Sequence, residues 1–88
     1  MDIVQRILNL LLAHLYEMTE HAIEGLDDHD FTLNDMLACL ASGQLKRSHR
    51  RGRKYEIEGK AVDGRGMRVV CRLIRQRYVR IITIYEVR

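Results

Sequence analysis

The spacing of apolar residues changes near residue 54, and this change constrains the fold more than any other feature. Before it, apolar residues recur every three or four positions, which is the period of an amphipathic helix. After it, the pattern changes to a period of two, which is the period of a strand that buries one face. Helices followed by a run of strands indicate an α+β fold. We therefore expect a single domain over residues 1–88, with two or three helices packed on one face of an antiparallel sheet.

Helix-start signals divide the first half of the chain. Thr19 and Thr32 are N-cap candidates, and Asp35 follows Thr32 at the spacing of a capping box. The first helix is apolar on two sides, which indicates burial on both sides or one side offered to a partner. The expected helices span about residues 2–15, 19–27 and 32–42. The residues expected to face inward in the second and third helices are Ile23, Leu26, Leu33, Met36, Leu37 and Leu40.

Three alternating segments separated by two turns predict a three-stranded antiparallel meander. The turns are expected at residues 63–66 and 75–77, where Gly, Asp and Arg gather. Because the odd-numbered residues of the middle strand are apolar, we place the odd-numbered face against the helices. On this parity Tyr55 and Tyr85 face the core. The expected strands span about residues 54–62, 66–74 and 78–86.

A three-residue turn at 75–77 would place Arg72 directly opposite Arg80 on the other face of the sheet. Like charges in this position are unfavourable. Two interpretations remain open. Either Glu56 screens the pair or both side chains extend into water, or the two arginines are placed to bind phosphates, which suit the planar guanidinium. A four-residue turn would reverse the parity of the last strand. In the phosphate interpretation, further cations of this face take part: Lys54, Lys60 and Arg68.

Charge is divided unevenly between the two halves of the chain. Residues 1–44 hold eight acids and one strong base, Arg6, for a net charge of −7. Residues 45–88 hold fourteen Lys and Arg and four acids, for a net charge of +10, which requires an anionic partner or an acidic neighbour. Six of the nine residues at 46–54 are Lys or Arg and none is apolar, so we expect a loop at about 45–53.

This basic loop has two interpretations: a footprint for a nucleic-acid backbone, or a solvated loop that balances the acidic helices. The residues expected to contact a nucleic acid are Lys46, Arg47, Arg50, Arg51, Arg53, Lys54 and Lys60.

The remaining polar chemistry of the chain is sparse. Cys39 and Cys71 stand alone and are expected to be buried and reduced. The histidine spacings make no metal site, and neither a metal nor another cofactor is expected. His21 and His49 are candidate acid–base groups, weighed against structural or solvated roles. No apolar run is long enough to span a bilayer, and residues 1–13 make no convincing signal peptide, so we expect a cytoplasmic protein without a membrane partner.

Short segments along nearly the whole chain carry a family resemblance. They are Tyr16-Glu17-Met18-Thr19-Glu20-His21-Ala22, Phe31-Thr32-Leu33-Asn34-Asp35, Leu40-Ala41-Ser42-Gly43, Tyr55-Glu56-Ile57-Glu58-Gly59-Lys60, Asp63-Gly64-Arg65, Arg68-Val69-Val70 and Ile81-Ile82-Thr83-Ile84-Tyr85. In this order they resemble the bacterial family known as domain of unknown function 4258, which looks like a relative of the RelE-type toxins. The resemblance implies helices on an antiparallel sheet, and RNA binding or metal-independent RNA cleavage by a cytosolic domain that a partner protein holds in check.

Three polar positions depart from the pattern of that family. Gly25 stands where the family commonly has an arginine, four residues after its helix histidine. His29-Asp30-Phe31 replaces an Arg-Gly-Ile type of segment, and Arg68 stands where a histidine is common. These departures predict an altered or weakened active site more than an altered fold.

Three functions follow as hypotheses. The first is a metal-independent ribonuclease, in which His21, His49 or a tyrosine exchanges protons. Charge stabilisation would come from Arg68, Arg72 and Arg80. The second is an RNA-binding module without catalysis. The third is a protein-interaction domain, in which the first helix forms a homodimer or binds a partner and the basic residues meet an acidic protein segment, such as that of an antitoxin.

Overall fold

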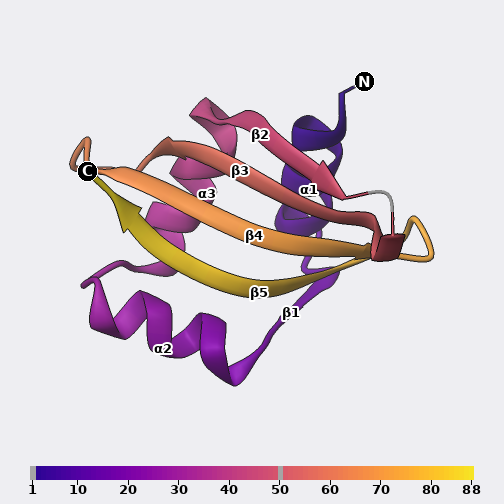
Figure 1. The fold of residues 1–88 in the computed structure, drawn as a ribbon, viewed down its shortest axis with the longest axis horizontal. Coiled ribbons are helices and arrows are strands. Elements are labelled where there is room, and N and C mark those ends of the chain that lie inside the picture. The colour runs from indigo at the N-terminus through magenta and orange to yellow at the C-terminus, as the bar shows by residue number, and fades with distance from the viewer. Residues whose placement is uncertain (1, 50) are drawn as a thin grey trace.

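The computed structural model describes residues 2–49 and 51–88, which form three α-helices and one five-stranded sheet (Figure 1). The elements in chain order are α1 (Ile3–Leu12), β1 (Tyr16–Met18), α2 (Glu20–Asp28), α3 (Leu33–Ser42), β2 (Gln44–His49), the 3-10 helix η1 (Arg51–Arg53), β3 (Lys54–Lys60), β4 (Gly66–Ile74) and β5 (Tyr78–Val87). The strand order is β1-β5-β4-β3-β2, with β1 parallel to β5 and every other pair antiparallel. The predicted α+β class is confirmed.

The helices leave one face of the sheet uncovered. In Figure 1, α1 and α3 lie behind the sheet, and α2 lies along its β5 side. We call the face away from α1 and α3 the open face. No helix in the described residues is long and apolar enough to cross a membrane.

The predicted meander is the centre of a wider sheet. Its three strands are β3, β4 and β5, and only β3 is shorter than expected, ending at Lys60. The loop expected at 45–53 is wrong, because residues 45–49 belong to β2 and residues 51–53 form η1. Five of the six β2 residues are exposed, so this edge strand lacks the apolar alternation of a half-buried strand. The first helix ends at Leu12, and β1 follows it.

The predicted helix caps are confirmed. The Thr19 side chain accepts a hydrogen bond from the backbone N–H of Ala22, and Thr32 and Asp35 form a capping box. The inward face of α2 differs from the prediction: Ile23 is 54% exposed, and Ala22 is buried instead. Leu33, at the start of α3, is 48% exposed, whereas Met36 and Leu40 are buried as expected.

Gly25 explains why small residues face the sheet in α2. A Cβ at this position would overlap the carbonyl oxygen of Ile84 in β5, so the helix lies almost directly on the strand backbone. An arginine at this position, as in the family pattern, would require α2 to lie further from β5. The exposed Ile23 follows from the same geometry, because the contact turns Ala22 and Gly25 inward.

A bulge in the β4–β5 ladder reverses the parity of β5. Leu73 pairs with Val79 across the three-residue turn, as expected, but the register shifts between Val70 and Cys71. Beyond that shift, Arg68 pairs with Tyr85. Tyr85 therefore lies on the open face, and its predicted place in the core is wrong. Tyr55 packs against the core as predicted.

Both cysteines are free and buried, as expected. Burial raises the pKa of Cys39 to about 11 and that of Cys71 to about 12. Because the thiolate is the reactive form, neither thiol is a nucleophile near neutral pH.

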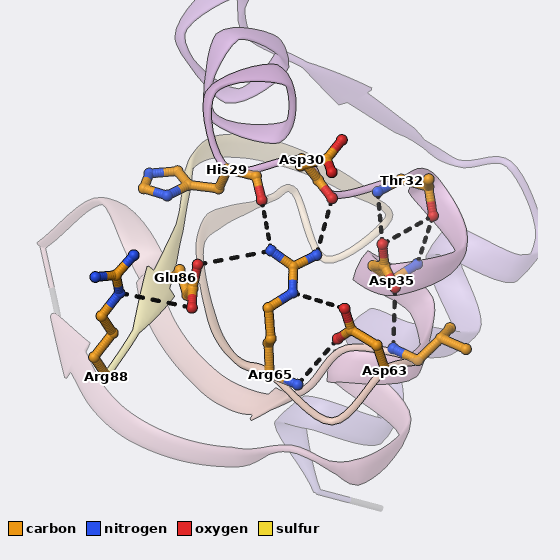
Figure 2. A network of polar contacts seen from close by, with 9 residues as sticks. His29, Asp30, Thr32, Asp35, Asp63, Arg65, Glu86 and Arg88 are labelled. Carbon is orange, nitrogen blue, oxygen red and sulfur yellow. Dashed lines mark hydrogen bonds and ion pairs between the residues drawn. The ribbon is translucent and has the colours of Figure 1, made fainter.

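Arg65 joins the β3–β4 turn to the segment between α2 and α3 (Figure 2). Its Nη1 and Nη2 donate to the backbone oxygens of His29 (2.7 Å) and Asp30 (2.9 Å). Its Nε donates to the Asp63 carboxylate (2.7 Å), and its guanidinium lies 4.4 Å from the centroid of the Phe31 ring. His29 and Asp30, which differ from the pattern of the resembled family, thus hold Arg65 through their main-chain oxygen atoms.

Asp35 connects the same two parts of the chain. Its carboxylate accepts hydrogen bonds from the backbone N–H groups of Thr32 (2.8 Å) and Val62 (3.0 Å). These bonds, that of Thr32 foremost, hold the pKa of Asp35 below its ordinary value. Arg65 and Asp35 therefore have structural roles at the end of the sheet where the β3–β4 turn lies (Figure 2).

The contact of Gly25 with β5 predicts that Gly25→Ala destabilises the domain. Overpacking a close contact costs about 1–3 kcal/mol. The better helix propensity of alanine offsets about 1 kcal/mol of this cost. These two terms leave a net cost of about 0–2 kcal/mol. Because the overlapped atom is a backbone oxygen that cannot rotate away, we expect the free energy of unfolding, measured in urea, to fall by about 1–2 kcal/mol.

Glu24→Ala, at the exposed neighbouring position of α2, is the control and should change this free energy by less than about 0.5 kcal/mol. A stabilising Gly25→Ala would contradict the close contact.

Candidate nucleic-acid interface

Strand pairing aligns one row of charged residues across the open face. Lys54 of β3 lies between His49 of β2 and Arg72 of β4. Arg80 of β5 lies between Arg72 and Glu17 of β1. The predicted pairing of Arg72 with Arg80 is thus confirmed. We call Lys54, Arg72 and Arg80 the cationic row.

Only one acid forms an ion pair with the cationic row in the described part of the chain. Arg80 Nε donates to the Glu17 carboxylate at 2.9 Å, and their side chains are 42% and 44% exposed, so the pair contributes little to stability. Glu56, the acid expected to screen the row, pairs with His49 and Arg68 instead.

Arg72 holds a hydrogen-bond donor without an acceptor. Its Nε is buried and, like the Nε of Arg68, has no partner among the described residues. An unsatisfied buried donor costs about 1–3 kcal/mol. Neighbouring Lys54 forms no ion pair within the described residues either.

Further arginines gather at the same end of the sheet. The helix η1 lies against β4, beside the turn that joins β4 to β5 (Figure 1). That turn carries two exposed arginines, and Arg6 of α1 holds it by a 2.7 Å hydrogen bond to the backbone oxygen of Gln76. We call this region the basic end; it comprises Arg51, Arg53, Lys54, Arg72, Arg75, Arg77 and Arg80.

Ion pairs neutralise Arg68 in the middle of the open face. Arg68 Nη2 donates to Glu58 at 2.6 Å, and Arg68 Nη1 lies 3.6 Å from Glu56. His49 Nε2 lies 2.9 Å from the other oxygen of Glu56. The hydrogen bond to Arg68 lowers the pKa of Glu58, and that to His49 lowers the pKa of Glu56. Glu58 in turn raises the pKa of Arg68, with a smaller contribution from Tyr85.

The predicted acid–base residues lie far apart. His21 is exposed on α2, which packs on β5, whereas His49 lies on β2 at the opposite edge. Strands β2 and β5 are three spacings apart, which is roughly 14 Å. One phosphodiester group therefore cannot contact both histidines. The predicted catalytic set is divided between two places.

The predicted cations are also distributed along the sheet. Lys46 and Lys60 lie near Glu58, and Arg47 lies near Glu56, where each lowers the pKa of the acid. Arg68 lies between those two acids. Arg50 lies outside the described residues. The predicted residues that gather at the basic end are Arg51, Arg53, Lys54, Arg72 and Arg80.

Sequence reasoning missed four residues of this surface. Arg75 and Arg77 were assigned only to a turn, although their neighbours Arg72 and Arg80 were already paired across it. Tyr78 lies opposite Ile74 on the open face, two residues from Arg80. Glu17 carried no signal, because its place beside Arg80 depends on the parallel pairing of β1.

A model of the family described as a domain of unknown function, DUF4258, matches residues 18–86. The chain belongs to this family. No curated protein and no solved structure matches the chain. The matched segment contains α2, α3, the strands from β2 to β4, and β5 as far as Glu86, so the whole basic end lies within the DUF4258 domain. The helix α1 precedes it.

The surface of this DUF4258 domain offers phosphate-binding groups more than metal ligands. In residues 2–49 and 51–88, no three His, Cys, Asp or Glu side chains gather as a metal site, and no pocket forms. The guanidinium groups of Arg72 and Arg80 provide forked donors for phosphate, and Lys54 adds a third cation. At the border of the row, the His49–Glu56 pair supplies a group able to exchange protons.

The His49–Glu56 contact predicts a measurable shift in His49→Ala. Without its largest stabilising partner, the Glu56 carboxylate should show a pKa closer to the ordinary value of 4.5. Carboxyl carbon NMR during an acid titration measures this change.

Glu58 is an internal control in the same spectra, because Arg68, not His49, is the main cause of its lowered pKa. The lowered pKa of Glu56 also makes the stability of the domain depend on pH. The contact stabilises the folded state fully above the ordinary pKa of the carboxylate, and this contribution is lost as the pH falls through the lowered pKa. An unchanged Glu56 pKa in the variant would contradict the contact.

Proposed function

We propose that this DUF4258 domain binds RNA, and that its basic end contacts the phosphate backbone. The observation that carries the proposal is the cationic row. Three cations lie side by side on adjacent strands, and an acid pairs with only one of them within the described residues. Like charges directly opposite one another on a sheet are destabilising. A bound phosphate offsets this repulsion by pairing its negative charge with the cations of the row.

The dimensions of the row suit a sugar–phosphate backbone. Three strands place the outer cations about 10 Å apart, which allows contact with neighbouring phosphates. The arginines of η1 and of the β4–β5 turn extend the same positive surface. Such contacts position a nucleic acid without reading its sequence.

The choice of RNA rests on two further observations. Tyr78 and Tyr85 both lie on the open face by their strand pairing, where unpaired bases can stack on their rings. The family resemblance seen in the sequence points to the RNA-directed RelE-type toxins, a relationship that remains a prediction.

Matched lysines of one strand test this proposal. Lys54 and Lys60 lie at opposite ends of β3 on the open face, and only Lys54 belongs to the cationic row. We expect Lys54→Ala and Arg72→Ala to weaken binding of a single-stranded RNA. Each should also reduce the slope of log Kd against log salt by roughly 0.7. Fluorescence anisotropy at several salt concentrations measures both quantities.

Lys60→Ala should leave affinity and slope unchanged. Equal losses in Lys54→Ala and Lys60→Ala would place the RNA elsewhere on the sheet. Binding by the wild-type domain that does not respond to salt would reject a backbone contact altogether. The DNA oligonucleotide of the same sequence tests whether the 2′-hydroxyl matters.

A second candidate function is metal-independent RNA cleavage next to the same row. The observation that favours it is the His49–Glu56 pair, because His49 lies opposite Lys54. When His49 Nε2 donates to Glu56, Nδ1 carries the lone pair that accepts a proton, as a general base requires. Lys54 and Arg72 would then stabilise the charge that develops on the phosphate.

Cleavage of labelled RNA in EDTA tests this candidate. We expect His49→Ala to reduce the cleavage rate about a hundredfold, since general base catalysis contributes at least that much. RNA affinity should change little. His21→Ala, exposed on α2, is the control and should retain the wild-type rate. Intact RNA with bound wild-type domain would reject cleavage and leave the binding proposal standing.

A further inference from the structure

The sheet ends in a free edge at β2. This strand has β3 on one side, and no strand of the described residues pairs with its other side (Figure 1). It is six residues long, and five of them are exposed. The opposite edge differs, because β1 has only three residues and lies against α2. An unpaired edge offers backbone N–H and C=O groups to another extended chain.

The two faces of this edge differ chemically. Leu45 pairs with the buried Ile57, so it lies on the helix side of the sheet, yet it is 41% exposed. A register shift follows Leu45, and both Lys46 and Arg47 lie close enough to the acids of the open face to lower their pKa values. The edge is thus cationic on the open face and apolar at Leu45.

A second copy of the chain is a poor occupant of this edge. Antiparallel pairing of β2 with itself would bring Lys46 and Arg47 against the same residues of the other copy. Like charges across a strand pair are unfavourable, and charged edge residues are a known device against self-association. The charge of the edge therefore selects an occupant of opposite sign.

We infer that the outer edge of β2 binds an acidic, extended segment of a partner protein, which adds to the sheet as a sixth strand. Backbone hydrogen bonds supply the general affinity in this mode of recognition, and the alternating side chains supply specificity. Acidic residues on one face of the added strand meet Lys46, Arg47 and His49. An apolar residue on its other face packs on Leu45. This inference does not depend on RNA binding.

A synthetic peptide of eight residues that alternates Glu and Val tests the inference. We expect it to bind the full chain and to slow amide hydrogen exchange in residues 44–48. A peptide with the same charge but with proline at two central positions should not bind, because proline removes the backbone donors of a strand.

Charge variants separate this edge from the rest of the sheet. Arg47→Glu should weaken peptide binding about tenfold, a difference of about 1.4 kcal/mol. Lys60→Glu, an exposed cation on β3, is the matched control and should change affinity little. Arg72→Ala should leave peptide affinity unchanged, so failure of the RNA proposal and failure of this one are distinguishable.

Four outcomes would overturn the inference. The first is equal binding of the proline peptide, and the second is peptide-induced protection only outside residues 44–48. In the third, amides 44–48 become protected as the chain is concentrated without peptide, which assigns the edge to a second copy. In the fourth, an RNA oligonucleotide protects these amides and the acidic peptide does not.

Discussion

The pairing of β4 with β5 positions the other elements of this domain. It fixes Arg72 opposite Arg80, and its bulge leaves Ile82 as the extra residue of β5. The bulge has a partner, because the Thr19 hydroxyl donates to the backbone oxygen of Ile82 at 2.9 Å. Thr19 is also the N-cap of α2, so one side chain connects the bulge to the helix start. From there α2 follows β5 to the close contact at Gly25.

The charge of the basic half of the chain is compensated unevenly. Glu56 and Glu58 lie within that half, and they pair with Arg68 and His49 on the open face. Among the described residues, only Glu17 forms an ion pair with the cationic row, and Glu17 belongs to the acidic half of the chain. Positive potential therefore concentrates at the basic end, although cations occur along the whole of residues 45–88.

The parts of the fold that follow from local chemistry were predictable. Thr19 and Thr32 identified the helix starts, and alternation identified β3, β4 and β5. The length of the turn at 75–77 was sufficient to pair Arg72 with Arg80. Prediction failed where long-range contacts decide. The strand β1 exists because β5 lies beside it, and β2 is an edge strand whose exposed residues leave no periodic signal.

The candidate site shows the same division. The parity of Tyr85 depends on a bulge that no residue type marked, and the exposure of Ile23 depends on the approach of α2 to β5. The separation of His21 from His49 follows from the strand order, which spacing along the chain does not encode. Arg72 and Arg80, which lie between the hairpin turn and the bulge, were therefore assigned to one surface correctly. Tyr85, beyond the bulge, and residues from distant elements were not.

The hydrogen bonds of Arg65 affect which substitutions the sequence of this domain can tolerate. Two of the anchors of Arg65 are carbonyl oxygens, which every amino acid possesses. The side chain at His29 can therefore be exchanged during evolution while both anchor points persist. At Asp30 the exchange is narrower, because its φ of 56° lies in the left-handed region that favours Gly, Asn and Asp. A position whose side chain departs from the family pattern can therefore keep its structural role through its backbone oxygen.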